Sequence, residues 1–193
     1  MATALTEYEM KLVTDQHLLL TKNKIIQKVC EFFGGLSELY KNVIIIESSP
    51  SLNLITPKIS RGENYKGLPY VILDYPRQFG KVDVFAIRTF FWWGNFFSIT
   101  LQLSGQYKND YLPHIEKAID EKLFESWYVG SSDDPWQHHF ESDNYQPLQP
   151  EKKYDFEDYR YLKIAKKIPL DKWDEAETFF EENFKLLIKI LAS

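Results

Sequence analysis

The stretch "FFWWGNFF", residues 90–97, sets six aromatic rings around a glycine-asparagine pair, and it decides the fold that we predict. Gly94 and Asn95 suit a tight hairpin turn because both residue types tolerate positive φ angles. Aromatic residues on both sides favour strands. We therefore predict an antiparallel hairpin formed by Val82–Trp93 and Phe96–Ser104.

The length of the hairpin loop fixes which side chains share a face of the sheet. With a two-residue loop, or a four-residue loop centred on the pair, Trp92 lies opposite Phe97. One face is then apolar except for Arg88, so we expect helices to cover it. The other face is mixed, with aromatic rings near the turn and polar side chains further away, among them Phe91, Trp93, Phe96 and Thr100.

Further strands are predicted on both sides of the hairpin, where β-branched and aromatic residues stand between turn-forming residues. A strand at Tyr70–Tyr75, bounded by two prolines, extends the hairpin into a meander over 70–104. A long loop is predicted over 48–69, which is rich in proline, glycine and serine. The remaining predicted strands are Val43–Ile46, Trp127–Val129, Trp136–Phe140 and Tyr159–Lys167.

Apolar residues at helical spacing predict three helices. The first begins at Thr21, and the pair Gly34-Gly35 ends or bends it. The second spans 111–124. The third begins near Asp171 and carries a long apolar stripe.

These elements favour the α+β class, with a mainly antiparallel sheet and helices packed mainly on one face, including the long C-terminal helix. We expect a single domain over 1–193, in which the polar, acidic segment 141–158 forms an exposed connection. A glycine-rich first turn and alternating βαβ units are absent from the sequence, so a parallel dinucleotide-binding fold is not expected. We expect no cofactor.

Composition excludes several classes of function. The 193 residues include 23 Lys+Arg and 28 Asp+Glu, and this acidic balance argues against a nucleic-acid-binding surface. The apolar runs are too short to cross a membrane. The single cysteine, Cys30, cannot form an intramolecular disulfide, and the start of the sequence has no secretion signal, so we expect a cytoplasmic protein.

Three of the aromatic rings need an explanation. Large aromatic side chains bury about 150–250 Å² each, so Phe91, Trp93 and Phe96 would together form an unusually large exposed patch. One interpretation is that other segments of the chain cover them. The other is a groove for a small apolar ligand, with polar groups such as Thr100, or a surface for self-association.

Arg88 needs a partner because an unpaired charge is costly on an apolar face. It is either paired with Asp74 on the adjacent predicted strand or free to hold an anionic ligand. In the second case, Arg61 and Lys66 from the basic loop are expected to contribute to the same site. The two alternatives differ in whether phosphate or sulfate stabilises the protein through Arg88.

The segment 133–141 holds Asp, His and Glu side chains, which are ligands of zinc and iron. The adjacent pair His138-His139 points to opposite faces of a strand, so the spacing is poor and we predict no metal site. The first functional hypothesis is a non-enzymatic domain that binds a small ligand or a protein partner through the aromatic sheet face and the basic loop. The alternative is an enzyme that acts on an anionic substrate around Arg88, with metal assistance from 133–141.

Overall fold

A computed structural model of the chain describes residues 3–47, 56–157 and 159–193. Its centre is a seven-stranded antiparallel sheet in the order β1-β2-β3-β4-β7-β5-β6. The strands are β1 (Lys58–Tyr65), β2 (Leu68–Phe79), β3 (Val84–Trp92), β4 (Phe96–Ser104), β5 (Tyr128–Gly130), β6 (Tyr145–Pro147) and β7 (Tyr161–Pro169). The helices are α1 (Glu7–Thr14), α2 (Gln16–Glu47), α3 (Gly105–Asp120), the 3-10 helix η2 (Leu170–Glu175) and α4 (Ala176–Ala192). The predicted α+β class, the meander and the long C-terminal helix are confirmed.

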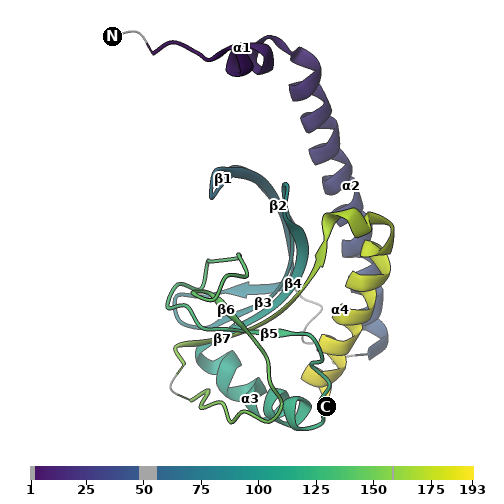
Figure 1. The fold of residues 1–193 in the computed structure, drawn as a ribbon. Coiled ribbons are helices and arrows are strands. Elements are labelled where there is room, and N and C mark those ends of the chain that lie inside the picture. Colours follow the sequence, from purple (N-terminus) through teal and green to yellow (C-terminus); the bar gives the residue numbers. More distant parts are fainter. Residues whose placement is uncertain (1–2, 48–55, 158) are drawn as a thin grey trace.

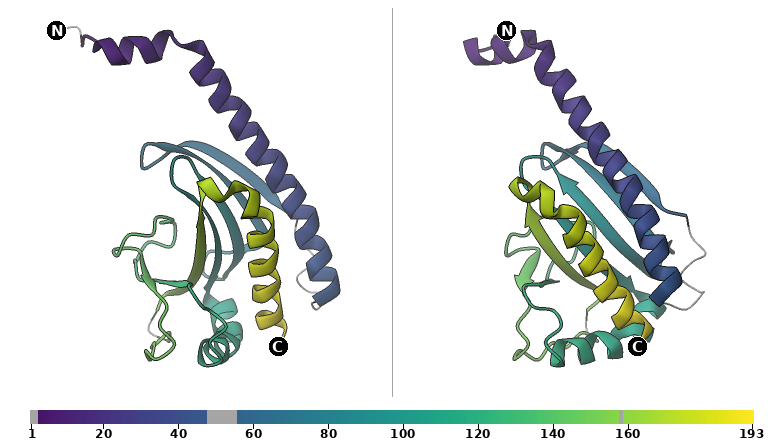
Figure 2. Two further views of the ribbon diagram at one scale, coloured as in Figure 1. Left: turned by 45° about the vertical axis from the view of Figure 1, so that its right-hand side comes forward. Right: turned by 90° about the vertical axis from the view of Figure 1, so that its right-hand side faces the viewer.

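The sheet is strongly curved, and its two faces are covered differently (Figure 1). Helices α2 and α4 lie side by side on one face, and α3 packs at one end of the sheet (Figure 2). The opposite, concave face is covered in part by the chain between β5 and β6. Within the described ranges, no helix combines the length and the apolar character that crossing a bilayer requires.

The core between the sheet and the helices holds one set of apolar side chains of β3 and β4, and a smaller cluster with Phe90, Trp92 and Phe96 lies on the other face. The apolar stripe predicted for the C-terminal helix is buried there through Phe180, Phe184 and Leu187. The Tyr40 ring of α2 stacks on Phe184 with 3.7 Å between ring centroids. The Tyr40 hydroxyl lies 2.9 Å from the Thr89 hydroxyl. This hydrogen bond gives a partner to Thr89, the polar side chain that β3 turns toward the helices.

The hairpin register differs from the prediction by one residue. The loop contains the three residues Trp93, Gly94 and Asn95, so Trp92 lies opposite Phe96 rather than Phe97. Gly94 adopts a φ of 71°, and the Asn95 backbone N–H donates to the Trp92 carbonyl at 3.0 Å. A third loop residue shifts β4 against β3 by one position, and a shift of one position exchanges the two faces of a strand.

The corrected register separates apolar from polar residues more cleanly than the predicted one. The helix-covered face carries Phe85, Ile87, Thr89 and Phe91 of β3 with Phe97, Ile99, Leu101 and Leu103 of β4. The concave face carries Arg88, Phe90 and Trp92 of β3 with Phe96, Ser98, Thr100 and Gln102 of β4. The expectation that helices cover the Arg88 face was therefore wrong.

Helix α2 replaces two predicted elements. The β-branched run Val43–Ile46 is helical, and Gly34-Gly35 neither ends nor bends the helix in its assigned span. Burial explains this outcome, because the buried residues of α2 recur at spacings of three and four and include both Val43 and Ile44. Packing of the apolar stripe of α2 against the sheet and α4 stabilises the helix here, and this stabilisation outweighs the strand preference of β-branched residues.

The described part of the predicted long loop over 48–69 is largely strand. Residues 48–55 lie outside the described residues, but 58–65 form β1, which a turn at Lys66-Gly67 connects to β2. Strand β2 also runs beyond the predicted boundaries and includes both of the flanking prolines. Pro76 falls in the register irregularity of β2 between Asp74 and Arg77, where a missing N–H is tolerated.

The remaining differences lie at the ends of elements. Helix α3 begins at Gly105 and ends at Asp120, so it starts earlier than the predicted 111–124 helix. The predicted strand Trp136–Phe140 is irregular chain. The segment 141–158, predicted to be an exposed connection, contains β6 and is exposed only in part, because Asn144, Tyr145, Leu148 and Phe156 are buried.

Candidate functional site

The structure places the predicted site residues in several different surroundings. Arg61 points to the helix side and lines a pocket of about 510 Å³ between β1 and α2. Arg88 lies on the concave face, so the two residues do not share a site. Lys66 stands at the β1–β2 turn and forms an ion pair with Glu141 at 3.6 Å. The anion site predicted from these three residues is not assembled in the structure.

Phe91, Trp93 and Phe96, the three rings predicted to need a cover or a ligand, lie on different faces of the sheet. Phe91 and Trp93 pack into the helix-side core, where Phe91 meets Trp173 of η2 at 6.4 Å between ring centroids. Phe96 is buried on the concave face and meets the Phe140 ring at 5.1 Å. Thus η2 contacts Phe91, Trp93 is half-buried beside Phe91 with a ring-centroid distance of 6.3 Å, and the chain between β5 and β6 covers Phe96.

Arg88 forms a buried ion pair with Asp74 on the concave face. Its Nε donates to Asp74 Oδ1 at 2.7 Å and its Nη2 donates to Oδ2 at 3.1 Å. The remaining nitrogen, Nη1, lies 3.3 Å from His138 Nε2. Burial and the neighbouring Arg88 charge hold the pKa of His138 well below its usual value, so the neutral imidazole can accept this hydrogen bond.

Lys163 is a second buried cation on this face. Its Nζ donates to the Gln137 carbonyl at 2.5 Å and lies 4.8 Å from the centre of the Tyr145 ring. Burial and then the Arg88 charge lower the pKa of Lys163 to about 7. Alternation along β7 places Lys167 on the same face as Lys163. Arg88, Lys163 and Lys167 therefore give this face three basic groups, against one buried carboxylate at Asp74.

A pocket of about 400 Å³ opens at the hairpin end of the concave face. Strand β5 pairs with β7 only at Ile164 and Ala165, which leaves the last residues of β7 without a neighbouring strand on that edge. The pocket fills this gap. We call it the hairpin pocket, and it is lined by Asn95, Phe96, Ser126, Tyr128, Lys166, Lys167 and Pro169.

Aromatic rings surround the Lys167 ammonium group in the hairpin pocket. Its Nζ lies 5.5 Å from the ring centre of Phe96, 5.7 Å from that of Tyr128 and 4.9 Å from that of Phe140. Neither Lys166 nor Lys167 forms an ion pair with any residue in the part of the chain that the structure describes. Lys166 leaves the strand on the opposite face, where its Nζ lies 5.9 Å from the centre of the Trp127 ring. The pocket thus combines apolar walls, the Lys167 ammonium group and the polar side chains of Asn95 and Ser126.

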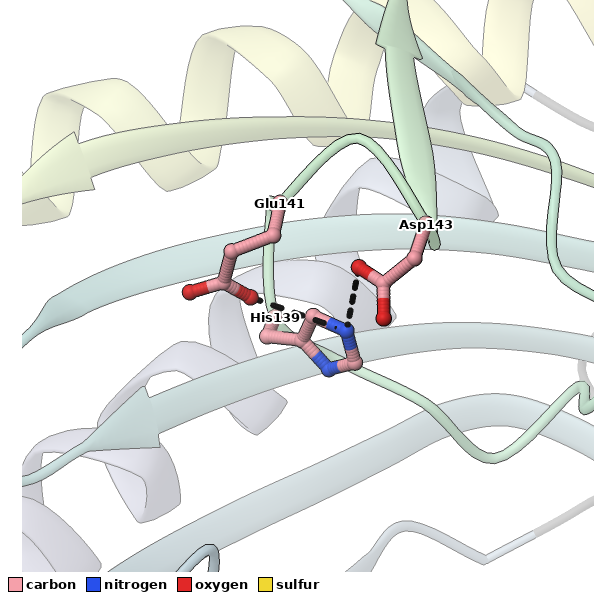
Figure 3. A group of neighbouring side chains, drawn as sticks. All are labelled: His139, Glu141 and Asp143. Carbon is pink, nitrogen blue, oxygen red and sulfur yellow. Dashed lines mark hydrogen bonds and ion pairs between the residues drawn. The ribbon is translucent and has the colours of Figure 1, made fainter.

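A separate group of potential metal ligands lies where the covering chain turns toward β6 (Figure 3). His139 is buried, and its Nε2 lies 3.1 Å from Asp143 Oδ1 and 3.6 Å from Glu141 Oε2. All three ligand atoms lie within 4.8 Å of one another. Both carboxylates are largely exposed, and Glu141 is shared with Lys66.

The hydrogen bonds of Tyr65 indicate which nitrogen of His139 carries a hydrogen atom. The Tyr65 hydroxyl accepts the backbone N–H groups of His138 and His139 at 2.7 and 3.0 Å, so its own hydrogen can be donated to His139 Nδ1 at 2.9 Å. Nε2 then carries the hydrogen and donates it to Asp143. A metal ion on Nε2 would require a hydrogen on Nδ1, facing a hydroxyl that already accepts two bonds. The geometry therefore favours a hydrogen-bonded group over a metal centre.

Comparison with known proteins found no match to this chain among protein-family models, curated proteins or solved structures.

The spacing of two lysines in the sequence could have indicated part of the hairpin pocket. Lys163 and Lys167 are four residues apart in a strand, and this spacing places both side chains on one face. Lys166, the preceding residue, lines the pocket but its side chain leaves the strand on the other face. The contribution of Tyr128 depends on the pairing of β5 with β7, which local sequence patterns do not specify.

Proposed function

We propose that the protein binds a small anionic ligand with an apolar or aromatic part in the hairpin pocket. The observation that carries this proposal is that the Lys167 ammonium group, which has no acidic partner among the described residues, lies beside the rings of Phe96 and Tyr128 in a pocket of about 400 Å³ that Lys166 also lines. Pockets for small molecules commonly have volumes of about 300–1,000 Å³ and combine apolar walls with a few polar groups.

The charge of the surrounding face supports an anion rather than a neutral ligand. Among its buried residues, the concave face holds two basic groups, Arg88 and Lys163, against one carboxylate, Asp74, and low-dielectric walls strengthen the attraction of such an excess for an anion. The rings of Phe96 and Tyr128 offer surface against which a planar or apolar group can pack. A carboxylate attached to an aromatic ring has both properties.

The enzymatic alternative around Arg88 has weaker support. Each nitrogen of its guanidinium group already faces an acceptor, on Asp74 or on His138. A substrate anion would have to displace one of these partners. Arg88 is therefore assigned a structural role in this proposal, and the ligand contacts are assigned to Lys166 and Lys167.

Thermal unfolding with matched ligands tests the proposal. We expect benzoate to raise the midpoint temperature and to bind in calorimetry, because it supplies both the ring and the charge. Benzyl alcohol, which has the ring without the charge, should have a much smaller effect, and so should inorganic phosphate, which has charge without a ring. A ligand at about 100 times its Kd should contribute about 2.7 kcal/mol to the free energy of unfolding.

A pair of charge-matched variants locates the binding. The double substitution Lys166→Gln, Lys167→Gln should abolish the benzoate effect. The control Lys152→Gln, Lys153→Gln removes the same charge from adjacent lysines at another surface and should retain it. The proposal fails if benzoate has no effect on the unmodified protein, or if the two double variants lose binding equally.

A further inference from the structure

The N-terminal segment extends away from the sheet and its packed helices (Figures 1 and 2). We call residues 3–24 the N-terminal arm; it consists of α1 and the first turns of α2. The arm has no buried residue. It nevertheless contains half of the sixteen large apolar side chains that are exposed among the described residues, namely Leu5, Tyr8, Met10, Leu12, Val13, Leu18, Leu19 and Leu20.

Helix α1 lacks the contacts that normally stabilise a helix of its length. It has eight residues and buries none of them. Isolated helices shorter than about 12–15 residues are marginal in water, because most helical stability in proteins comes from packing an apolar face. The capping box between Thr6 and Glu9 favours the start of α1 but supplies no buried surface. A helix at this position therefore indicates that another surface covers it.

The apolar pattern of the arm continues a pattern that is buried in the body of α2. The buried residues alternate at spacings of three and four, as Ile26, Val29, Phe33, Leu36, Tyr40 and Val43. The same alternation continues toward the N-terminus through Lys22, Leu19, Asp15, Leu12, Tyr8 and Leu5. Four of these six positions are apolar, although α1 and α2 are separated by a break at Asp15. A stripe with this heptad spacing is the surface that one helix presents to another.

The charges of the arm point to a partner with the same sequence. Before the break, Glu7 and Glu9 stand against the single Lys11, whereas Lys22 and Lys24 follow the break on α2. Two arms placed antiparallel bring the acidic part of each beside the basic part of the other, and a two-fold axis makes both contacts at once. A parallel pairing would place like charges together. The acidic α1 also argues against an anionic membrane surface, which attracts segments rich in lysine and arginine.

The apolar stripe supplies a typical share of the area of a specific contact. A large apolar side chain presents on the order of 120 Å². Half of that area on the four apolar side chains of the stripe is roughly 240 Å² per copy, or about 500 Å² for two copies. A specific interface buries about 1,000 Å² or more, of which somewhat more than half is apolar, so polar and backbone contacts along the arms would supply the remainder.

We propose that the N-terminal arm is a dimerisation surface whose partner is the arm of a second copy of this chain, paired antiparallel through the stripe that contains Leu12 and Leu19. This inference does not depend on the anion-binding proposal, since the arm and the hairpin pocket share no residue. In the dimer, each arm covers the apolar stripe of the other, and α1 gains the contacts that it lacks in a single copy.

Light scattering coupled to size-exclusion chromatography of the full chain tests the proposal. We expect a mass twice that of the 22.9 kDa chain at micromolar concentrations. Leu19→Glu should shift the protein to a monomer, because it places a charge in the paired stripe. Leu20→Glu is the matched control, since this neighbouring leucine is exposed but lies off the stripe. Neither leucine contributes to the core, so both variants should remain folded, and only Leu19→Glu should lose the small part of the helical circular dichroism signal that comes from α1.

Single cysteines introduced into a Cys30→Ser background test the orientation. A cysteine at His17, near the centre of the antiparallel pair, should form a disulfide between copies, whereas a cysteine at Leu5 should not. Efficient cross-linking at Leu5 would overturn the antiparallel arrangement. A monomer at every concentration, equal masses for the Leu19→Glu and Leu20→Glu variants, or arm-dependent binding to vesicles by a monomeric protein would overturn the dimer.

Discussion

Asp74 and Arg88 stand directly opposite each other on β2 and β3, and their side chains form a two-point ion pair that is more than nine-tenths buried. The pair lies at the middle of the concave face, where Arg88 also meets His138. It therefore joins three segments that are distant in the sequence. The direct cross-strand position fixes the alignment of β2 with β3 next to the register irregularity at Asp74 and Arg77.

We expect Arg88→Met to lower the free energy of unfolding by about 3–5 kcal/mol, because it leaves the Asp74 carboxylate buried without a partner. The double variant Asp74→Leu, Arg88→Met should recover much of this loss, since it removes both charges. Urea unfolding of the three proteins measures the difference. If the double variant loses as much free energy of unfolding as the two single variants lose together, Asp74 and Arg88 do not stabilise each other, and the ion pair does not explain why Arg88 is buried.

The helices show which parts of the fold the sequence can predict. The stripe of α4 is predictable because its apolar residues repeat at helical spacing and have no competing pattern. The strand predicted at Val43–Ile46 was wrong because a short β-branched run suits either a strand or a buried helix. Packing against the sheet and α4 favours the helix, and the local sequence does not show this packing. The prediction that Gly34-Gly35 ends or bends the helix failed for a related reason, since packing along α2 outweighs the helix-propensity cost of the two glycines.

The candidate site was harder to predict because it depends on register and on long-range pairing. One additional loop residue in the Trp93–Asn95 turn exchanges the faces of β4 and places Phe96 on the face that carries Arg88. The grouping of Asp74 with Arg88 was predictable, since neighbouring strands of a meander pair locally. The hairpin pocket was not, because Tyr128 reaches it only through the pairing of β5 with β7.

Lys163 should make stability depend on pH. Its pKa is about 7 in the folded protein, against about 10.5 in the unfolded chain, so between these values the unfolded chain binds more protons. The free energy of unfolding should therefore rise as pH increases above about 7, by at most about 1.4 kcal/mol per pH unit from this group. Well below pH 7, Lys163 is protonated in both the folded and the unfolded state, so the free energy of unfolding no longer changes with pH through this group.

Comparison with Lys163→Met isolates this contribution from other titrating groups. Unfolding free energies measured from pH 6 to 9 should rise more steeply in the unmodified protein than in the variant. The variant should also be relatively more stable at pH 6, where the folded protein must hold a buried charge. Parallel pH profiles for the two proteins would show that Lys163 keeps its ordinary pKa.

Tyr65 should anchor the chain that covers the concave face. Its hydroxyl accepts two backbone hydrogen bonds, from His138 and His139, and Tyr65→Phe leaves both N–H groups without this acceptor. We expect a loss of about 1–3 kcal/mol in the free energy of unfolding for an unsatisfied buried donor. Hydrogen exchange should accelerate at 137–140 and remain unchanged in α4. Unchanged exchange at 137–140 would show that other contacts hold this segment.

Two glycine substitutions should have opposite effects, because the two residues occupy different backbone conformations. Gly94 has a φ of 71° in the hairpin loop, so Gly94→Ala should lower the free energy of unfolding by about 1 kcal/mol. Gly35 is exposed within α2, and a Cβ there would meet no atom within 4 Å, so Gly35→Ala should raise it by about 0.5–1 kcal/mol. Urea unfolding of both variants gives the two values. A destabilising Gly35→Ala would contradict the continuous helix, and a neutral Gly94→Ala would contradict the three-residue loop that sets the register of the concave face.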